Sequence, residues 1–536
     1  MKLDTKKVFL IGLAFFLISL FWQTYDSVVT KILIDKFGLN QTWSGVVMAM
    51  DNVLALFLLP LFGGLSDRTN SKRGRRTPYI IIGTVIAAFA FVTLSFSDSY
   101  QTAKIESQTS IIEDYGSIQT ADLNVTEWNT IFSVMTAERT TALSTQEITQ
   151  DIFDTWQEKI ATPIQNILDD NTASDAVIDS SETELLRDYY YSYLSNRAWE
   201  LTTTNPTIFI VFIVTLFLAL IAMSTFRSPA VALMPDVTIK PLRSKANAII
   251  NLMGTFGGIL SIVILTLWGL DKQSYVNYTP AFITVGVLML VLLAIFLWKV
   301  REPKLVAERE ADDIRYGLTE ENEAKVLGET VEELSKEKRR ALFLILFSVF
   351  LWFIGYNAVT TKLSDYAPKV LNLGYAMPLL IAQGAALIAF VPIGILATKI
   401  GRRKTILMGI TLLTFCFGSV YFINESTAVF MYVIFALTGV GWATINVNSY
   451  PMVVELSKGS NVGKYTGYYY TFSMAAQILT PILSGVLMDL WGRKVLFPYA
   501  TLFVALAFIT MFFVKHGDAA IIKKDSILEN FDVDMD

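Results

Sequence analysis

Long apolar runs recur along the whole chain, separated by polar or charged stretches. A helix needs roughly 20 apolar residues to cross the hydrocarbon core of a bilayer. The pattern predicts twelve membrane-spanning helices, at 8–30, 43–63, 78–97, 207–226, 246–268, 279–299, 341–361, 376–397, 405–423, 428–449, 466–488 and 497–515. We therefore expect an all-α membrane protein, with both termini on the same side because the number of spans is even.

Two hydrophilic segments interrupt this pattern and suggest the domain organisation. Residues 99–204, between the third and fourth spans, contain eighteen acidic and five basic residues. We expect a small, partly helical domain there, with a poorly ordered acidic loop as the alternative. Residues 301–340 carry charges of both signs and are expected to form a solvated connector. The chain then divides into a first half (1–300), a linker (301–340), a second half (341–515) and a tail (516–536).

The orientation of the chain in the membrane follows from the basic residues in its short loops, because loops rich in Lys and Arg are retained in the cytoplasm. The loops at 64–77, 238–245 and 398–404 are basic and fall on the same side of the twelve-span arrangement, together with the N-terminus. We therefore expect both termini to be cytoplasmic and segment 99–204 to lie outside. Arg493 and Lys494 contradict this orientation, because their loop falls on the outer side.

Composition supports the membrane interpretation and excludes several other classes. The chain is 53% hydrophobic and only 17% charged, against about a quarter charged in soluble proteins. Its net charge of −5 gives no reason to expect a nucleic-acid partner. The single cysteine, Cys416, and the single histidine, His516, exclude disulfides and make zinc or histidine-based chemistry unexpected. The chain also lacks a phosphate-binding loop of the Gly-x₄-Gly-Lys type, so neither an enzyme nor an ATP-driven pump is expected.

The two halves share sequence features at equivalent helix ends. GLSDRTNSKRGRRTP (64–78) follows the second span, and GILATKIGRRKTI (394–406) follows the eighth. The fourth and tenth spans end on a carboxylate, Asp236 and Glu455. Such correspondence indicates a duplicated six-helix unit.

The first of these loops resembles the loop signature of the major facilitator superfamily, which runs roughly Gly-x-Leu-x-Asp-Arg-x-Gly-Arg-Arg. The second copy keeps Gly394, Gly401, Arg402 and Arg403 but lacks the Asp. The longer form SDRTNSKRGRRTPYI, together with FRSPAVALMPDV, RSKANAIINLMGTFGG and GYYYTFSMAAQILTP, resembles the sucrose–proton symporters and the glycoside–pentoside–hexuronide cation symporters. The resemblance implies the major facilitator fold, two six-helix pseudo-repeats, and sugar transport. The large 99–204 insertion departs from the family pattern, as does the lack of histidine in the first two spans.

The loop signature also suggests gating. The charge of Asp67 can pair with Arg68 or with Arg75 and Arg76, and can interact with a helix N-terminus. Such contacts can hold the inner side shut, although positive charge that only fixes topology is the alternative. The candidate gating residues are Gly64, Asp67, Arg68, Gly74, Arg75, Arg76, Asp236, Arg402, Arg403 and Glu455.

Asp26 and Asp51 are the ionisable residues within the first two predicted spans. A carboxylate in hydrocarbon is unfavourable by a few kcal/mol and is therefore a candidate functional group. Both lie about ten residues from the turn that joins the two spans, so they are expected at similar depth. The pair could carry a proton, or bind Na⁺ with Gln23 and Asn52. The alternative is that they only line a watery vestibule. Arg227 is the nearest candidate cation, or else an interfacial anchor.

A sugar site needs amides and acids beside an aromatic surface, and several spans offer these side chains. The candidate substrate-binding residues are Trp22, Gln23, Tyr25, Asn52, Arg227, Trp352, Asn357, Trp442, Asn446 and Gln477. For the aromatic residues, packing or an interfacial belt is the competing explanation.

Together these features predict a monomeric secondary transporter of the plasma membrane, surrounded by lipid and without a cofactor. It would carry a sugar or glycoside, such as a disaccharide, in symport with H⁺ or alternatively Na⁺. Two other hypotheses remain: an efflux carrier for other organic solutes, and a non-transporting sensor or scaffold that uses the outer segment to bind a partner.

Overall fold

The computed structural model describes residues 3–118, 123–171, 178–239, 242–271, 274–316, 336–455 and 462–514. The regular elements in these ranges are all helices. Eleven of the described helices are long and apolar enough to cross a membrane, and a twelfth has a shorter apolar stretch, Ala376–Phe390. The predicted all-α membrane fold is confirmed.

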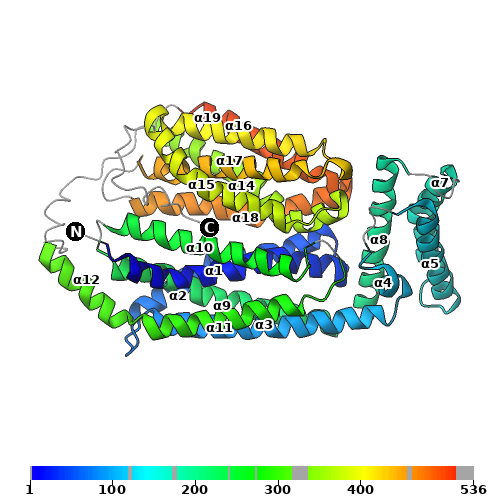
Figure 1. The fold of residues 1–536 in the computed structure, drawn as a ribbon, viewed down its shortest axis with the longest axis horizontal. Coiled ribbons are helices and arrows are strands. Elements are labelled where there is room, and N and C mark those ends of the chain that lie inside the picture. Colours follow the sequence, from blue (N-terminus) through cyan, green and yellow to red (C-terminus); the bar gives the residue numbers. More distant parts are fainter. Residues whose placement is uncertain are drawn as a thin grey trace.

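The membrane helices form two groups of six that lie side by side along the long axis of the molecule (Figure 1). The first half contains α1 (Thr5–Lys31), α2 (Gln41–Arg68), α3 (Thr77–Glu106), α9 (Thr207–Val237), α10 (Arg243–Leu267) and α11 (Thr279–Lys299). Helix α1 continues directly into a π-helical turn, η1 (Ile32–Lys36). The second half contains α14 (Lys336–Leu371), α15 (Ala376–Ile400), α16 (Arg402–Val420), α17 (Phe430–Glu455), α18 (Val462–Trp491) and α19 (Leu496–Phe512). Each half has its own apolar core.

Several helices run further than the predicted spans, which corrects their boundaries. Helix α14 continues ten residues beyond the predicted end at 361, and α3 continues nine beyond 97. The extensions carry charged residues that are buried, Lys362, Asp365 and Asp98 among them. Apolar runs alone do not detect these turns, because paired charges replace hydrophobic side chains there. Asp26 and Asp51, which are half-buried, are thus two of several ionisable groups within the helices.

The described residues between 107 and 204 form a helical cluster beyond one end of the bundle, which we call the insertion end (Figure 1). Its helices are α4 (Ser110–Tyr115), α5 (Val125–Ser144), α6 (Gln150–Trp156), η2 (Gln157–Ala161), α7 (Thr162–Asp170) and α8 (Ser180–Thr204). Trp128, Trp156, Tyr190 and Tyr193 belong to a separate apolar core in this cluster. Within it burial would lower the pKa of Arg197, but the charges of Glu138 and Glu200 outweigh this effect and raise it.

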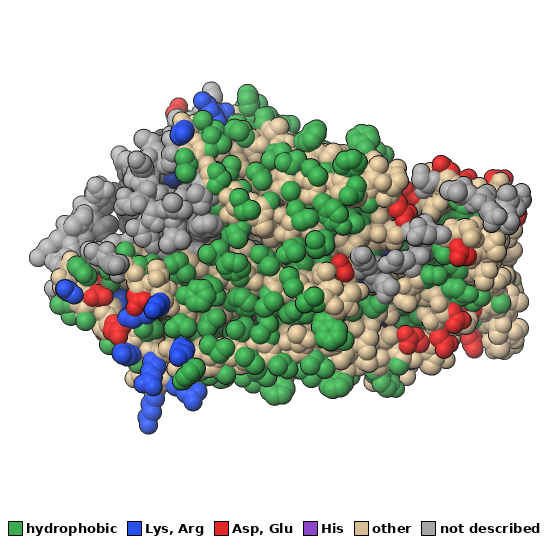
Figure 2. Space-filling view, in the orientation of Figure 1, with side chains coloured by type: hydrophobic (Ala, Val, Ile, Leu, Met, Phe, Trp, Pro, Cys, Tyr) green, Lys and Arg blue, Asp and Glu red, His purple; other side chains and the backbone are tan. Residues whose placement is uncertain are grey.

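At the opposite end, which we call the loop end, α12 (Glu302–Tyr316) lies close to the 69–76 loop (Figure 1). Figure 2 shows cations gathered at the loop end, acidic side chains over the insertion, and a broad apolar surface between them. That apolar surface suits a lipid environment. The remainder of the predicted 301–340 connector, from residue 317 to 335, and the predicted tail 516–536 lie outside the described residues.

Helices α2 and α18 join the two halves at close range. A Cβ atom at Gly45 of α2 would overlap the backbone carbonyl of Pro481, and one at Gly485 of α18 would overlap the carbonyl of Gln41. Small residues let membrane helices approach backbone to backbone. The two glycines therefore allow the halves to meet tightly near the insertion end.

Candidate functional site

The two predicted coupling carboxylates are brought together near the middle of the bundle. Asp26 and Asp51 are each about ten residues, or roughly 15 Å, from the insertion-end limit of their helical segments. They lie within electrostatic range of each other and of the Tyr25 hydroxyl. Arg227 of α9 lies within electrostatic range of Asp51. The structure therefore brings Asp26, Asp51 and Tyr25 together and places Arg227 within electrostatic range of Asp51.

The amides predicted beside these acids already have partners. Asn52 donates to Asp51 Oδ1 from both its backbone N–H (2.5 Å) and its side-chain Nδ2 (2.7 Å). Gln23 Oε1 accepts from Gln383 Nε2 of α15 at 2.8 Å, so this pair links the two halves at mid-depth. Gln383 was missed in the sequence, where a lone Gln in the eighth apolar run was the only signal.

Three buried donors close to this depth have no hydrogen-bond partner among the described residues: Trp22 Nε1, Tyr25 Oη and Asn357 Nδ2. Trp22 and Asn357 each lie about fourteen residues from the insertion-end limit of their helical segments, Lys36 and Leu371, so they share a depth. A buried donor without a partner is unfavourable by about 1–3 kcal/mol. A hydroxyl-rich ligand could satisfy such donors.

The predicted aromatic residues of the second half have different environments. Trp442 stacks on Tyr356, with ring centroids 3.8 Å apart and planes 9° from parallel. Trp352 is fully buried in the core of the second half and packs away from solvent. Asn446 is also largely buried, whereas Gln477 is half-buried. Their assignment to a substrate site stays a prediction.

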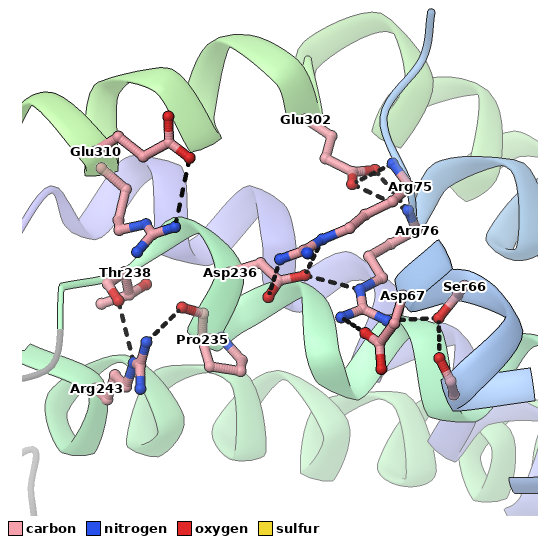
Figure 3. Close-up of polar contacts among 12 residues, drawn as sticks. Ser66, Asp67, Arg75, Arg76, Pro235, Asp236, Thr238, Arg243, Glu302 and Glu310 are labelled. Carbon is pink, nitrogen blue, oxygen red and sulfur yellow. Dashed lines mark hydrogen bonds and ion pairs between the residues drawn. The ribbon is translucent and has the colours of Figure 1, made fainter. Parts of the chain in front are cut away.

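The 64–77 loop forms a compact charge cluster with Asp236 at the loop end (Figure 3). Asp236 of α9 binds Arg75 (2.8 Å) and Arg76 (2.7 Å), and Asp67 binds Arg76 at 2.5 Å. Burial would lower the pKa of Arg76, but the contacts with Asp236 and Asp67 outweigh it and raise that pKa. Of the alternatives considered for Asp67, the structure therefore selects Arg76. These contacts lie within the first half.

Glu302, at the start of α12, completes this cluster and was not predicted. It is buried, and its carboxylate accepts the backbone N–H groups of Arg75 (2.8 Å), Arg76 (2.9 Å) and Thr77 (2.8 Å). These are the amides of the two residues that precede α3 and of its first residue, Thr77, and the N-cap residue Arg76 makes no side-chain cap hydrogen bond of its own. Glu302 therefore caps α3 from another helix. Gly74 has φ +103° and passes so close that a Cβ atom would overlap Glu302.

The other candidate gating residues have less distinctive surroundings. Gly64 has no atom within 4 Å of a Cβ position, and Arg68 is exposed. In the second copy, Arg402 begins α16. Arg403 donates to the carbonyl of Phe512 at 2.5 Å. The side chain of Glu455 lies outside the described residues.

The insertion end holds a buried ionic network that the sequence did not suggest. Lys369 of α14 binds Asp35 of the first half at 2.5 Å and Asp365 of its own helix at 2.6 Å. All three side chains are at most 3% exposed. Burying such charges is tolerable only because they are paired. The pairing of Lys369 with Asp35 links the two halves.

The start of α2 is fastened to the second half by further hydrogen bonds. Lys362 donates to the carbonyl of Gln41 at 2.9 Å, and Gln41 Nε2 donates to Asp365 at 2.6 Å. Asp489 of α18 accepts the backbone N–H groups of Gln41 (2.9 Å) and Thr42 (2.8 Å). With the Lys369–Asp35 pair, we call these contacts the seam. They join the two halves at the insertion end of the bundle.

The basic loop that conflicted with the predicted orientation is paired with acids. Arg493 binds Asp365 at 3.0 Å and Asp188 of α8 at 3.2 Å. Lys494 binds Glu184 of α8. The positive charges of Arg493 and Lys494 are therefore largely neutralised by acidic partners. This explains how a basic loop can lie at the end of the bundle opposite to the other basic loops.

Two family models match this chain. The model described as Major Facilitator Superfamily matches residues 198–481 and 379–525, and the model described as MFS/sugar transport protein matches residues 10–138. Among curated relatives, the Uncharacterized symporter YnaJ of Bacillus subtilis (strain 168) is 30% identical over 87 residues, which is 16% of this chain and 19% of that protein. The Sucrose transport protein SUC4 of Arabidopsis thaliana is 32% identical over 73 residues, 14% of each chain. The chain thus matches less than a fifth of either relative.

Solved structures share the fold. A D-xylose-proton symporter has a TM-score of 0.54 at 13% identity, over 96% of this chain and 99% of its own. The inward open xylose transporter XylE from E. coli has a TM-score of 0.53 at 13% identity, over 96% of each chain. A POT family transporter in complex with 5-aminolevulinic acid reaches 0.57 at 10% identity, over 95% of each. Because the first family model covers more than half of the sequence, the chain belongs to the Major Facilitator Superfamily of membrane transporters.

Proposed function

We propose that this transporter is a cation-coupled symporter of a sugar or glycoside, with H⁺ as the coupling ion. The observation that carries the proposal is the pair Asp26 and Asp51 near mid-depth, with Arg227 within electrostatic range of Asp51. Buried donors without a hydrogen-bond partner among the described residues lie at a similar depth. Transport proceeds by rocking of the two halves around this point. The two curated relatives, one named a symporter and the other a sucrose transport protein, support the same class.

Coupling is assigned to the two carboxylates. Two negative charges at short range in a medium of low dielectric repel each other strongly. Binding one proton between them removes this repulsion, and Arg227 competes with the proton for Asp51. Such a group takes up H⁺ when open to one side and releases it when open to the other. A Na⁺ site that includes Gln23 and Asn52 is less favoured, because Asn52 already donates to Asp51 and the Gln23 oxygen already accepts from Gln383.

The substrate class is assigned from the donors around this point. Sugar hydroxyls both donate and accept hydrogen bonds, so they can satisfy Trp22, Tyr25 and Asn357 at the same time as a carboxylate. The stacked Tyr356–Trp442 pair offers an aromatic face to the C–H side of a sugar ring. An apolar drug would leave the donors unsatisfied, and this favours the sugar over the efflux alternative.

The orientation proposed from the loops also fits the charge distribution. The loop end carries the clustered cations and the insertion end carries the acids (Figure 2). We assign the loop end to the cytoplasm of a plasma membrane, following the positive-inside tendency. The seam then closes the outer side, and the cluster of Arg75, Arg76 and Asp236 would exchange partners when the inner side closes.

The test is uptake of radiolabelled sugars into proteoliposomes, first under a pH gradient and then under a Na⁺ gradient. The panel contains sucrose, maltose, melibiose and a uronide. We expect one sugar to accumulate with the pH gradient in the wild type and in Asp154→Asn, whose side chain is exposed on the insertion. Asp26→Asn and Asp51→Asn are expected to abolish accumulation. The absence of uptake of every sugar under both gradients would refute the glycoside assignment.

A further inference from the structure

Helix α8 of the insertion contacts the second half through charged residues near its start. Arg187 is buried and binds both Glu425, between α16 and α17, and the carbonyl of Val370 at 3.2 Å. Asp188 and Glu184 bind Arg493 and Lys494, as described above. This part of α8 is therefore held to the second half by ion pairs and one backbone hydrogen bond.

The C-terminal part of α8 is fixed to the first half in a different way. Gly38, in the turn before α2, has φ +68°, and a Cβ atom there would overlap the backbone of Ser195 and Trp199. Lys104 of α3 donates to the carbonyl of Leu201 at 3.0 Å, and Gln101 donates to Thr202 Oγ1 at 3.3 Å. Here the contact is partly backbone to backbone.

Arg187 and Trp199 are twelve residues apart on one helix, or roughly 18 Å. The single helix α8 thus contacts both halves. Between these two contact regions, Lys369 Nζ of the seam lies 5.3 Å from the centroid of the Tyr191 ring of α8. A helix placed in this way cannot keep both sets of contacts when the halves separate at this end.

We propose that α8 is a strap that holds the insertion end of the transport path closed. When that end opens, α8 moves with the first half and releases Glu425, Arg493 and Lys494 of the second half. The insertion therefore sets how often the outer side opens. The inference rests on the proposed alternating access, but it does not depend on the identity of the substrate.

The ionic contacts are the ones expected to break. Ion pairs between partly exposed side chains contribute about 1 kcal/mol or less each. This applies to Asp188–Arg493 and Glu184–Lys494, where Asp188 is 38% and Lys494 53% exposed. The pair of Arg187 with Glu425 is more buried, with exposed fractions of 1% and 29%. Close backbone packing at Gly38 cannot be released without moving α8 as a whole. We therefore expect α8 to release its ion pairs with the second half reversibly and to keep its close packing against the first half.

The test measures the width of the insertion end directly by pulsed electron–electron spin resonance. Spin labels are placed at Tyr100→Cys in α3 and Phe422→Cys after α16, two exposed positions in different halves. The background is Cys416→Ser, which removes the single natural cysteine. The full chain is studied in lipid nanodiscs, without any sugar, so the result does not depend on the substrate assignment.

The strap variant is Glu184→Ala/Arg187→Ala/Asp188→Ala. Its matched control, Asp151→Ala/Glu158→Ala/Lys159→Ala, removes the same charges from exposed positions elsewhere in the insertion. Asp188→Asn is a milder variant in case the triple variant does not fold. Asp489→Asn weakens one contact of the seam, with the N–H groups of Gln41 and Thr42, without changing α8, and serves as the reference for a more open insertion end.

We expect the population with a long distance between the labels to rise roughly fivefold in the strap variant. This is the change expected when the free energy that favours the closed insertion end falls by about 1 kcal/mol. Asp188→Asn should give a smaller rise, and the matched control none. If Asp489→Asn lengthens the distance but both strap variants match the wild type, the strap is refuted and alternating access stands. If the distance is the same in every variant, including Asp489→Asn, the alternating-access proposal fails along with the strap.

Discussion

At the scale of single residues, the carboxylate of Glu302 fixes the start of α3 against the start of α12 at the loop end. Glu302 accepts hydrogen bonds from the backbone of Arg75 and Arg76 and from both the backbone and the hydroxyl of Thr77. It therefore holds the first turn of α3 and the start of α12 in one position. Gly74 is required beside it because of its positive φ and its closeness to the carboxylate.

Glu302→Ala should destabilise the protein by about 2–4 kcal/mol, because several buried N–H groups lose a charged acceptor. Thermal unfolding in detergent, followed by the intrinsic fluorescence of the tryptophans, measures the effect. Glu310→Ala is the control, since the side chain of Glu310 is 62% exposed on the same helix. Equal unfolding temperatures for the two variants would contradict the capping role.

Asp51→Asn should separate coupling from substrate binding. Without a titratable group at this position, concentrative uptake should fall by at least about tenfold, because the pH gradient can no longer act through it. Exchange of labelled for unlabelled sugar across the membrane requires no net proton movement and should persist. Loss of exchange together with uptake would instead indicate a structural or substrate-binding role for Asp51.

At the scale of elements, the sequence predicted where the membrane helices lie better than it predicted where they end. The apolar runs located the membrane helices found among the described residues, and the loop copies suggested the duplicated halves. The seam was not predictable, because Lys362, Asp365 and Lys369 read as polar loop residues beyond an apolar run. Their burial depends on partners far away in the chain, such as Gln41 and Asp35. The central acids were predictable because a charge within an apolar run stands out.

Gly485→Val should weaken closure of the insertion end, since the added side chain must push α18 away from the Gln41 carbonyl. The same spin-label pair should then show a larger share of long distances. Gly467→Val is the matched control on the same helix, because no atom lies within 4 Å of a Cβ position at Gly467. An unchanged distance distribution in Gly485→Val would show that the two helices do not limit closure.

Trp128→Ala should loosen the insertion without loosening the bundle. Trp128 is 1% exposed and packs edge-on against Tyr190, 5.9 Å away. Removing a buried aromatic side chain lowers stability by about 3–5 kcal/mol. Hydrogen exchange should accelerate in α5 to α7 and remain unchanged in α1 and α2, which contribute no residue to this core. Faster exchange throughout the chain would contradict the independence of the insertion core.

At the scale of the whole molecule, the structure has a seam at one end, a charge cluster at the other and two carboxylates between them. The family and the fold account for the two halves and for the loop cluster. The insertion departs from the family pattern, and its helix α8 contacts both halves at the closed end. Conformational control and ion coupling are thus assigned to different parts of the chain, and each can be tested alone.

The central claim, that sugar and proton move together, is tested most directly by the current that follows a rapid sugar jump on proteoliposomes adsorbed to a solid-supported membrane. With no ion gradient imposed, symport with H⁺ predicts a transient current carrying positive charge in the direction of the sugar. The current should be present without Na⁺, and absent in Asp26→Asn and Asp51→Asn. Sugar uptake that proceeds without any current, or a current that needs Na⁺, would contradict proton symport.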